Sequence, residues 1–336
     1  MLCEALEAPD AVARQLSHNA KEYRDFGSLL REKVRHSILT IARGSSDHAA
    51  HFMAYLIMAR LGHLVTSLPM SLVTLYQSKI DCSGLVSLAF SQSGQSPDLV
   101  APTQFFSKGG ACTAAFVNQA NSPLGLAAKW VFPLHAGDEK SVAATKSFIA
   151  QMVAGARVVA SWKQDPVFLS AIAELPTALS HAAEQDWSEA LEVLRGVDRL
   201  FVIGRGTGMP VALEAALKFK ETCGIQAEAF SGAEVKHGPM AIINDRYPLM
   251  IFAPRGPAQA GLLALADEMR NRGARVLLAA PRGTLGANLF ITETGSEDLD
   301  PISTIQSFYP MVEALARARG MDPDHPPYLA KVTRTH

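Results

Sequence analysis

The chain has 336 residues, of which 48% are hydrophobic and 19% are charged. This length suits two domains that each have their own core, and the composition is typical of a compact α/β protein. The 31 basic and 32 acidic residues give a net charge of −1, which argues against nucleic acid or an anionic membrane as a partner.

The first half of the chain alternates short apolar runs with helical patterns. Residues 1–36 predict an amphipathic helical lead-in, and a first domain is expected over 37–162. Its strands are expected at 37–42, 85–90, 111–117 and 131–134, and its helices at 47–61, 97–108 and 139–162. This alternation predicts a parallel, doubly wound sheet.

The second half repeats that alternation after a helical linker expected at 163–195. A second domain is expected over 196–320. Its strands are expected at 200–203, 248–253, 274–279 and 289–292, and its helices at 210–223, 258–271 and 302–319. The proline-rich tail, 321–336, predicts an extended arm.

The two halves also share residues at a fixed offset of 162. Residues 41–46 (IARGSS) match 203–208 (IGRGTG), and Gly62 and Gly224 fall in the same register without a gap. Residues 91–94 (SQSG) likewise match 253–256 (APRG). A repeat of this length indicates a duplicated domain. The first copy carries a hydroxyl-rich turn, whereas the second carries a set of Glu, Lys and His side chains.

The hydroxyl-rich turn lies where a strand ends and a helix begins. Ligands of open α/β sheets bind at the carboxyl ends of strands, and a helix N-terminus offers free N–H groups to an anion. The sequence therefore predicts a phosphate cradle, although an ordinary turn that caps a helix is an equal alternative. The cradle is expected to comprise Gly44, Ser45, Ser46, Ser91, Gln92, Ser93, Gly94 and Ser96.

The second glycine-rich turn, at 204–208, superficially suggests a dinucleotide fingerprint. That fingerprint requires a glycine where this chain has Met209, so NAD is not expected. His48, His51 and His63 have no carboxylate at a suitable spacing, and we expect them in the core or at the surface rather than on a metal. We expect neither a metal nor a redox cofactor.

Glu214, Lys218 and Glu221 are spaced by four and three residues, which places them on one face of a helix. Spacing alone favours a solvated face with a weak ion pair, whereas the start of this helix at a strand end favours a functional site. His237 lies in a loop restricted by glycine and proline, where a lone histidine is either structural or a proton carrier. Lys331 alone indicates an ordinary solvated lysine.

The cellular location is predicted from cysteine usage and from the first segment. The four cysteines form no CxxC motif, which favours free thiols in a reducing compartment. The N-terminal residues have no signal-peptide pattern, and the most apolar helix-like stretch, 148–162, is too short and too polar to span a bilayer. We therefore expect a cytoplasmic protein that does not enter a membrane.

Six motifs, taken together and in order, carry a family resemblance. They are 43–46 (RGSS), 91–94 (SQSG), 141–146 (SVAATK), 212–221 (ALEAALKFKE), 234–239 (EVKHGP) and 329–331 (LAK). On these motifs the chain resembles the sugar isomerase (SIS) superfamily, and more closely the isomerase half of glucosamine-6-phosphate synthase and the stand-alone SIS-type glucosamine-6-phosphate deaminases. The resemblance implies two tandem SIS domains, each a flavodoxin-like parallel sheet flanked by helices.

The resemblance also implies roles for individual residues. The serines and Gln92 of the cradle would bind a sugar phosphate, and Val142 and Ala143 would line the sugar site through backbone groups. Glu221 would move a proton between C1 and C2, with Lys218 and Glu214 assisting. His237, supplied by the partner subunit of a homodimer, would assist ring opening, and Lys331 would meet the open-chain ketose as a free amine.

Departures from the synthase pattern determine the expected reaction. The synthase begins with a glutamine-hydrolysing domain whose nucleophile is a cysteine directly after the initiator Met, whereas this chain has Leu2 and then Cys3. Without that ammonia source, we expect conversion of glucosamine 6-phosphate to fructose 6-phosphate and ammonia. Arg43 and Gln95 stand where the synthase commonly has Cys and Glu. Alternatives are a glutaminase-less aminotransferase-like isomerase, a fructosamine-6-phosphate deglycase, another phosphosugar isomerase, or a phosphosugar-sensing module without catalysis.

Overall fold

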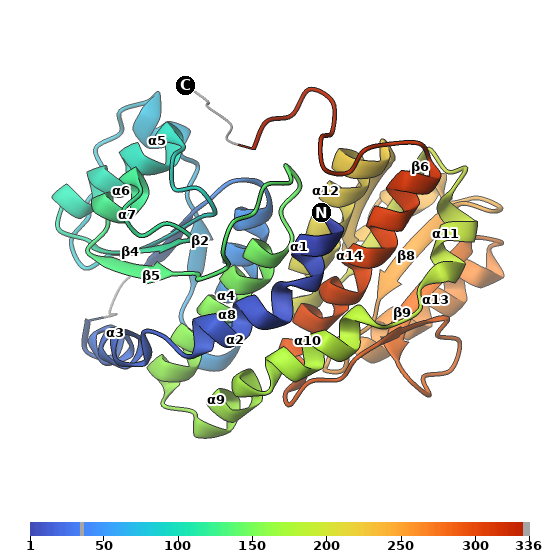
Figure 1. The fold of residues 1–336 in the computed structure, drawn as a ribbon, viewed down its shortest axis with the longest axis horizontal. Coiled ribbons are helices and arrows are strands. Elements are labelled where there is room, and N and C mark those ends of the chain that lie inside the picture. The colour runs from blue at the N-terminus through green and yellow to red at the C-terminus, as the bar shows by residue number, and fades with distance from the viewer. Residues whose placement is uncertain (34–36, 332–336) are drawn as a thin grey trace. The chain divides into compact units, whose positions relative to one another are not determined.

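A computed structural model describes residues 1–33 and 37–331 of the chain. In this described part the chain divides into two compact units, each built on one parallel sheet (Figure 1). The first-sheet unit comprises 10–139, 146–173 and the tail from residue 330. The second-sheet unit comprises 1–9, 140–145 and 174–329. These bounds differ from the expected domains, because 1–9 and 140–145 pack within the unit of the second sheet.

The first sheet has the strand order β2-β1-β3-β4-β5, and its described strands are all parallel. The strands are β1 (Ile38–Ile41), β2 (Val65–Ser67), β3 (Val86–Ser91), β4 (Cys112–Val117) and β5 (Trp130–Pro133). The associated helices are α2 (Ala8–Leu16), α3 (Ala20–Lys33), α4 (Gly44–Leu61), α5 (Ser71–Thr74), α6 (Pro97–Lys108), α7 (Pro123–Ala127), α8 (Lys146–Lys163) and α9 (Pro166–Ala173).

The second sheet has the same connectivity, in the order β7-β6-β8-β9-β10, and its described strands are parallel as well. The strands are β6 (Arg199–Gly204), β7 (Gln226–Ser231), β8 (Pro248–Phe252), β9 (Arg275–Pro281) and β10 (Leu289–Ile291). The helices are α1 (Leu2–Leu6), α10 (Leu175–Ala183), α11 (Ser188–Leu194), α12 (Met209–Cys223), α13 (Gln259–Asn271) and α14 (Asp300–Ala318). Short 3₁₀ turns are η1 (Gly206–Gly208), η2 (Glu234–Lys236), η3 (Pro239–Ile242) and η4 (Glu297–Leu299).

The offset of 162 residues holds in three dimensions. Adding 162 to the bounds of β3 and α6 gives 248–253 and 259–270, which β8 and α13 occupy almost residue for residue. Gly62 ends α4 and Gly224 ends α12, and both are left-handed, with φ of 72° and 61°. Only glycine adopts this backbone geometry without steric cost, so the matched glycines fix equivalent helix ends. The predicted duplication of a doubly wound domain is confirmed.

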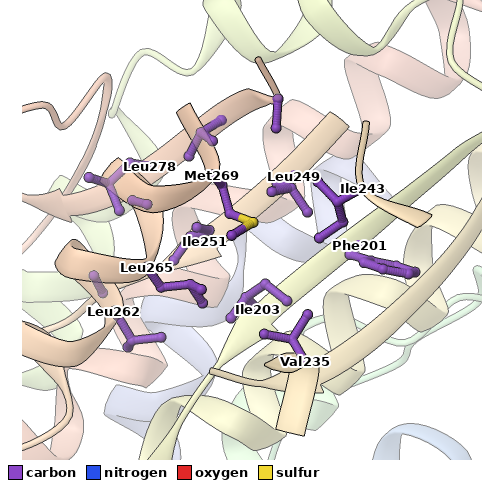
Figure 2. Close-up of a cluster of buried hydrophobic side chains, with 14 of the residues drawn as sticks. Phe201, Ile203, Val235, Ile243, Leu249, Ile251, Leu262, Leu265, Met269 and Leu278 are labelled. Atoms are coloured by element: carbon purple, nitrogen blue, oxygen red, sulfur yellow. The ribbon is translucent and has the colours of Figure 1, made fainter. Parts of the chain in front are cut away.

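Helix α13 shows how the second sheet is covered. Figure 2 shows Leu262, Leu265 and Met269 of α13 lying against side chains from β6 and β8, among them Ile203 and Ile251. All of these side chains are almost fully buried. Burial of a side chain of this size stabilises the fold by roughly 1.5–3 kcal/mol, so this contact fixes α13 on the sheet.

Several expected elements differ from the structure. The helix expected at 139–162 begins at Lys146, because Glu139 accepts hydrogen bonds from the first turn of α8 rather than joining it. The helical lead-in expected over 1–36 comprises three helices in its described residues, α1 to α3. Strands β2 and β7 were not expected, since both lie at sheet edges and carry exposed polar residues that obscure the apolar pattern.

The tail contains no helix or strand between 321 and 331, which agrees with the extended arm expected there. Residues 332–336 of that arm lie outside the described residues, as do 34–36 of the lead-in. None of the helices in the described part of the chain combines the length and apolar character that crossing a bilayer requires.

Candidate active site

The predicted phosphate cradle lies at the switch point of the first sheet. β1 and β3 are paired neighbours, but the chain leaves β1 toward β2 on one side and returns to β3 on the other. Gly44, Ser45 and Ser46 form the first turn of α4 directly after β1, and Ser91 ends β3. Ligands of doubly wound sheets bind outside the carboxyl ends of the strands at this point. The fold therefore brings both predicted groups of serines to the expected edge.

The turn after β3, residues 91–96, is held by its own hydroxyls. Ser91 Oγ accepts a hydrogen bond from the N–H of Gly94 at 3.0 Å, and Ser93 Oγ accepts one from the N–H of Gln95 at 3.3 Å. Gly94 has a φ of 64°. A Cβ on Gly94 would lie 2.1 Å from Ser122 Oγ, so only glycine fits at this position.

The loop that follows β4 fixes the same turn from outside. The Leu124 N–H donates to the carbonyl of Gly94 at 3.0 Å, and the Asn118 N–H donates to the carbonyl of Gln92 at 3.3 Å. Ser122, which is almost fully buried, caps α7 by accepting from the N–H of Gly125. The turn is thus pre-organised by a neighbouring loop that sequence reasoning did not single out.

Ser96 is the N-cap residue of α6, and its carbonyl accepts from the N–H groups of Leu99 and Val100 at 3.1 Å. The Ser96 side chain makes no capping hydrogen bond within the described residues, and Pro97 lies in the first turn of α6. The first N–H groups of α6 are therefore not capped by the Ser96 hydroxyl.

Two further side chains border the switch point. Arg43, the N-cap residue of α4, donates from Nε to Asp98 Oδ2 at 3.1 Å, with a largely exposed guanidinium and a largely buried carboxylate. Gln151 of α8 donates to Ser46 Oγ at 3.0 Å. Asp98 and Gln151 were missed because one resembles an ordinary first-turn acid and the other lies 105 residues from Ser46.

The tail lysine is engaged rather than solvated. Lys331 Nζ lies 3.0 Å from Glu139 Oε2, and the Lys331 side chain is 23% exposed. The Glu139 carboxylate is fully buried. The interpretation of Lys331 as an ordinary surface lysine is therefore wrong, and no motif in the sequence indicated Glu139 as its partner.

The second-sheet unit contains the charged set of α12. Lys218 Nζ lies 3.1 Å from Glu214 Oε1 and 2.6 Å from Glu221 Oε2. The side chains of Lys218 and Glu214 are fully buried, and that of Glu221 is 19% exposed. The solvated face favoured by spacing alone is wrong, because in the structure this face of α12 is largely buried.

The two neighbouring carboxylates determine the direction in which the pKa of Lys218 is shifted. Burial lowers the pKa of Lys218, but the adjacent carboxylates of Glu214 and Glu221 outweigh this effect and leave the pKa raised. Lys218 is therefore a permanent positive charge against Glu221. A partly exposed carboxylate beside a fixed ammonium is suited to taking a proton from a ligand and returning it.

At the switch point of the second sheet, the turn after β8 carries an arginine that pairs within the protein. Arg255, which occupies the position of Ser93 in the repeat, pairs with Asp300 through Nε at 2.7 Å and a terminal nitrogen at 2.8 Å. The same terminal nitrogen donates to the carbonyl of Thr294 at 2.7 Å. The fully buried Asp300 thus engages the one strongly basic side chain of this turn.

The remaining predicted residues also lie in the second-sheet unit. His237 follows η2 with an exposed side chain, and its N–H donates to the carbonyl of Glu234 at 2.9 Å. The Val142 N–H donates to the carbonyl of Asp324 at 3.3 Å, and Ala143 is fully buried. The predicted residues therefore form two sets, one in each unit, of which the serine turn and the α12 face are each well defined.

Comparison with known proteins places this arrangement in a family. The model of the SIS domain matches residues 32–161 and 193–283. The glutamine–fructose-6-phosphate aminotransferase (isomerizing) of Zymomonas mobilis subsp. mobilis is 31% identical over 312 residues, which cover 88% of this chain and 51% of that enzyme. The chain thus spans about half the length of the curated relatives it matches.

Solved structures agree with that assignment. A protein from Silicibacter pomeroyi, assigned as a phosphosugar isomerase, is 40% identical with a TM-score of 0.91, over 96% of this chain and 99% of that one. The C-terminal domain of the Francisella tularensis glucosamine-fructose-6-phosphate aminotransferase has a TM-score of 0.87 at 24% identity, covering 97% of each chain.

A more distant structure shares the fold alone. The glucosamine-6-phosphate deaminase of Thermotoga maritima has a TM-score of 0.74 at 19% identity, over 97% of this chain and all of that one. The SIS model matches two segments of the chain, and each sheet has the strand order 2-1-3-4-5. Together with the relatives, these findings show that this chain belongs to the SIS domain family.

Proposed function

We propose that this protein is a SIS-type phosphosugar enzyme of the isomerase class that converts glucosamine 6-phosphate and water to fructose 6-phosphate and ammonia. The observation that carries the proposal is the α12 face, where Glu221 remains partly exposed while Lys218 and Glu214 are fully buried beside it. A protein that only binds a phosphosugar needs a phosphate cradle but no such proton-transfer group.

The phosphate of the substrate is assigned to the switch point of the first sheet. The hydroxyls and N–H groups of 91–96 and the first turns of α4 and α6 offer donors to a dianion without a lysine or arginine in the turn. Ser45, Ser46, Ser91, Gln92, Ser93 and Ser96 are the proposed ligands. Gly44 and Gly94 allow the backbone to turn at positive φ.

Glu221 is the proposed base. It removes the proton from C2 of the open-chain amino sugar and returns it to C1, while O1 takes a proton from the C2 ammonium, so that the aldose becomes a ketose imine with a hydroxyl at C1. Lys218 Nζ, 2.6 Å from Glu221 Oε2, orients the Glu221 carboxylate, and Glu214 balances the charge of Lys218. The Lys331 amine then displaces ammonia from the C2 imine, and hydrolysis of the resulting imine between C2 and Lys331 leaves fructose 6-phosphate.

His237, Val142, Ala143 and Lys331 complete the proposed set. His237 assists opening of the sugar ring and is supplied by the second chain of a homodimer, for which its exposed position in a loop is suitable. Val142 and Ala143 contribute backbone groups to the sugar site. Lys331 meets the C2 carbonyl of the open-chain ketose as an amine.

The names of the relatives favour a second candidate, the sugar-isomerising half of the aminotransferase reaction. That candidate shares the phosphate cradle and the C1–C2 proton transfer. It differs in that nitrogen is added to fructose 6-phosphate rather than removed from glucosamine 6-phosphate. Release of ammonia from the amino sugar therefore separates the two.

The test is to incubate the purified protein with glucosamine 6-phosphate and to measure ammonia and fructose 6-phosphate together. We expect equal amounts of both products, and a loss of about 100-fold or more in the variant Glu221→Gln. Lys220→Gln changes an exposed neighbour on the same helix and serves as the matched control, with activity near that of the unmodified protein. Absence of both products, or full activity of Glu221→Gln, would contradict the proposal.

A further inference from the structure

Glu139 is the last residue of the connection from β5 that belongs to the first-sheet unit. Its carboxylate turns toward the start of α8, where Oε1 accepts from the Ser147 N–H at 3.1 Å and Oε2 accepts from Ser147 Oγ at 2.6 Å. A carboxylate at a helix N-terminus is stabilised by the free N–H groups and by the helix dipole. Glu139 is therefore held against the first turn of α8 in a fully buried position.

The same oxygen that accepts from Ser147 Oγ also contacts Lys331. Nζ of Lys331 lies 3.0 Å from Oε2, so the ammonium and the hydroxyl share one carboxylate oxygen. Ion pairs that are fully hydrogen-bonded and shielded from water are short and directional. Since residues 321–331 contain no helix or strand, backbone hydrogen bonds of regular structure do not fix where Lys331 lies.

From these contacts we propose that Glu139 holds the ammonium of Lys331 in the resting protein and takes the proton of Lys331 when this amine reacts. The inference rests on the proposed function, in which Lys331 meets a ketose carbonyl. This reaction requires Lys331 as a neutral amine, whereas in the structure Lys331 Nζ lies 3.0 Å from the Glu139 carboxylate.

The step balances with the residues present. The proton passes from Lys331 Nζ to Glu139 Oε2, which leaves a neutral amine and a neutral acid. The nitrogen lone pair then attacks C2 of the open-chain ketose, and the C2–O π bond breaks to give a carbinolamine. Glu139 returns its proton as the C2–O bond breaks, so that water leaves and a protonated imine joins C2 to Lys331.

The first test reads Lys331 itself and does not depend on turnover. Reductive methylation with formaldehyde and cyanoborohydride is followed at Lys331 by peptide mass spectrometry in the full-length protein. We expect Glu139→Gln, which keeps the shape but removes the charge, to accelerate methylation of Lys331 at least about threefold, because the ammonium loses its partner. An unchanged rate in Glu139→Gln would overturn the inference whether or not the enzyme has the proposed activity.

The second test separates positioning from general stability. With glucosamine 6-phosphate, Glu139→Gln should lower kcat about 100-fold while KM stays within about threefold, and Glu139→Asp should recover about tenfold of that loss. Ser147→Ala removes the hydroxyl from the same carboxylate but keeps the ion pair, so its kcat and its Lys331 methylation should stay within about twofold. If Ser147→Ala lost as much as Glu139→Gln, the role of Glu139 would be structural and the inference wrong.

Failure of the proposed function would look different. If the unmodified protein made neither product, or if Lys331→Arg were fully active, the role assigned to Lys331 would fail. The methylation result for Glu139→Gln would still decide whether Glu139 holds Lys331.

Discussion

The two sheets of this protein share one strand order and one residue register, yet their switch points differ in chemistry. In the first sheet the turn after β3 presents Ser91 and Ser93 beside Gly94. In the second sheet Arg255 stands at the position of Ser93, and the buried Asp300 binds it. Duplication supplied two equivalent edges, of which one carries serine hydroxyls and the other carries an arginine that pairs with a buried aspartate.

The helices that follow the first strand of each sheet also differ, and here the charged residues are in the second copy. In α4 the positions equivalent to Glu214 and Lys218 are Phe52 and Leu56, and both are fully buried. The same two positions of α12 are also fully buried, but they are charged. Since an apolar pair satisfies this packing in α4, the ion pair in α12 is not needed to build the fold. The buried ion pair of α12 is therefore a candidate for a functional role rather than a requirement of the fold.

The largest expected effect comes from making α12 resemble α4. Lys218→Met leaves the buried Glu214 without the ammonium that it contacts, and we expect a loss of about 3–5 kcal/mol in the free energy of unfolding. Leu56→Met, at the equivalent position of α4, should cost less than about 1.5 kcal/mol. Urea unfolding of both variants measures the difference, and equal losses would mean that the two helix faces are energetically alike.

The next effect concerns the two turns. Gly94→Ala places a Cβ 2.1 Å from Ser122 Oγ, so the turn must open, and we expect affinity for fructose 6-phosphate to fall about 100-fold. Gly256→Ala is the matched control, because the atoms nearest to its Cβ belong to Glu297 at 3.6 Å. Calorimetric titration should show unchanged affinity for this control, although its φ of 117° will cost some stability. Similar losses in both variants would contradict the assignment of the ligand to the first turn.

A third change opens the second switch point. Arg255→Ala removes the bidentate partner of the buried Asp300, and we expect unfolding to become easier by about 1–3 kcal/mol. Affinity for fructose 6-phosphate should stay within about twofold, since Arg255 is engaged by Asp300 rather than by a ligand. The comparison requires thermal unfolding beside calorimetry. Weaker binding without a change in stability would show that Arg255 belongs to the ligand site.

The smallest expected effect is the counterpart of that change in the first turn. Ser93→Ala removes one hydroxyl donor to the phosphate, so we expect affinity to fall about tenfold. Its only described hydrogen bond is a long one, at 3.3 Å from the Gln95 N–H, so the free energy of unfolding should change by less than about 0.5 kcal/mol. Stability loss without loss of affinity would reverse the roles that we assign to Ser93 and Arg255.

Much of this architecture could be predicted from the sequence because the relevant signals are local. Gly62 and Gly224 mark equivalent helix ends, and the gapless offset of 162 residues was visible before any element was placed. The serine turn was predictable because a strand end and a helix start adjoin it. The edge strands β2 and β7 were not, since short, partly exposed strands lack an apolar period.

Only part of the candidate site could be predicted from the sequence, for a physical reason. Spacing placed Glu214, Lys218 and Glu221 on one face, but whether that face is solvated depends on packing against distant parts of the chain. Glu139 and Lys331 are separated by 192 residues and share no motif, so no local pattern joins them. The alignment of the two copies could have predicted this burial. Phe52 and Leu56 lie in the core of the first copy, and they are equivalent to Glu214 and Lys218.

The most direct test of the central claim is calorimetric titration of Glu221→Gln with fructose 6-phosphate. If the serine turn binds the phosphate and Glu221 transfers the proton, this variant will bind one fructose 6-phosphate per chain. Its affinity will lie within about threefold of the unmodified protein, while ammonia release from glucosamine 6-phosphate falls about 100-fold or more. Loss of binding in Glu221→Gln, or two equivalent sites per chain, would contradict the separate roles proposed for the serine turn and for Glu221.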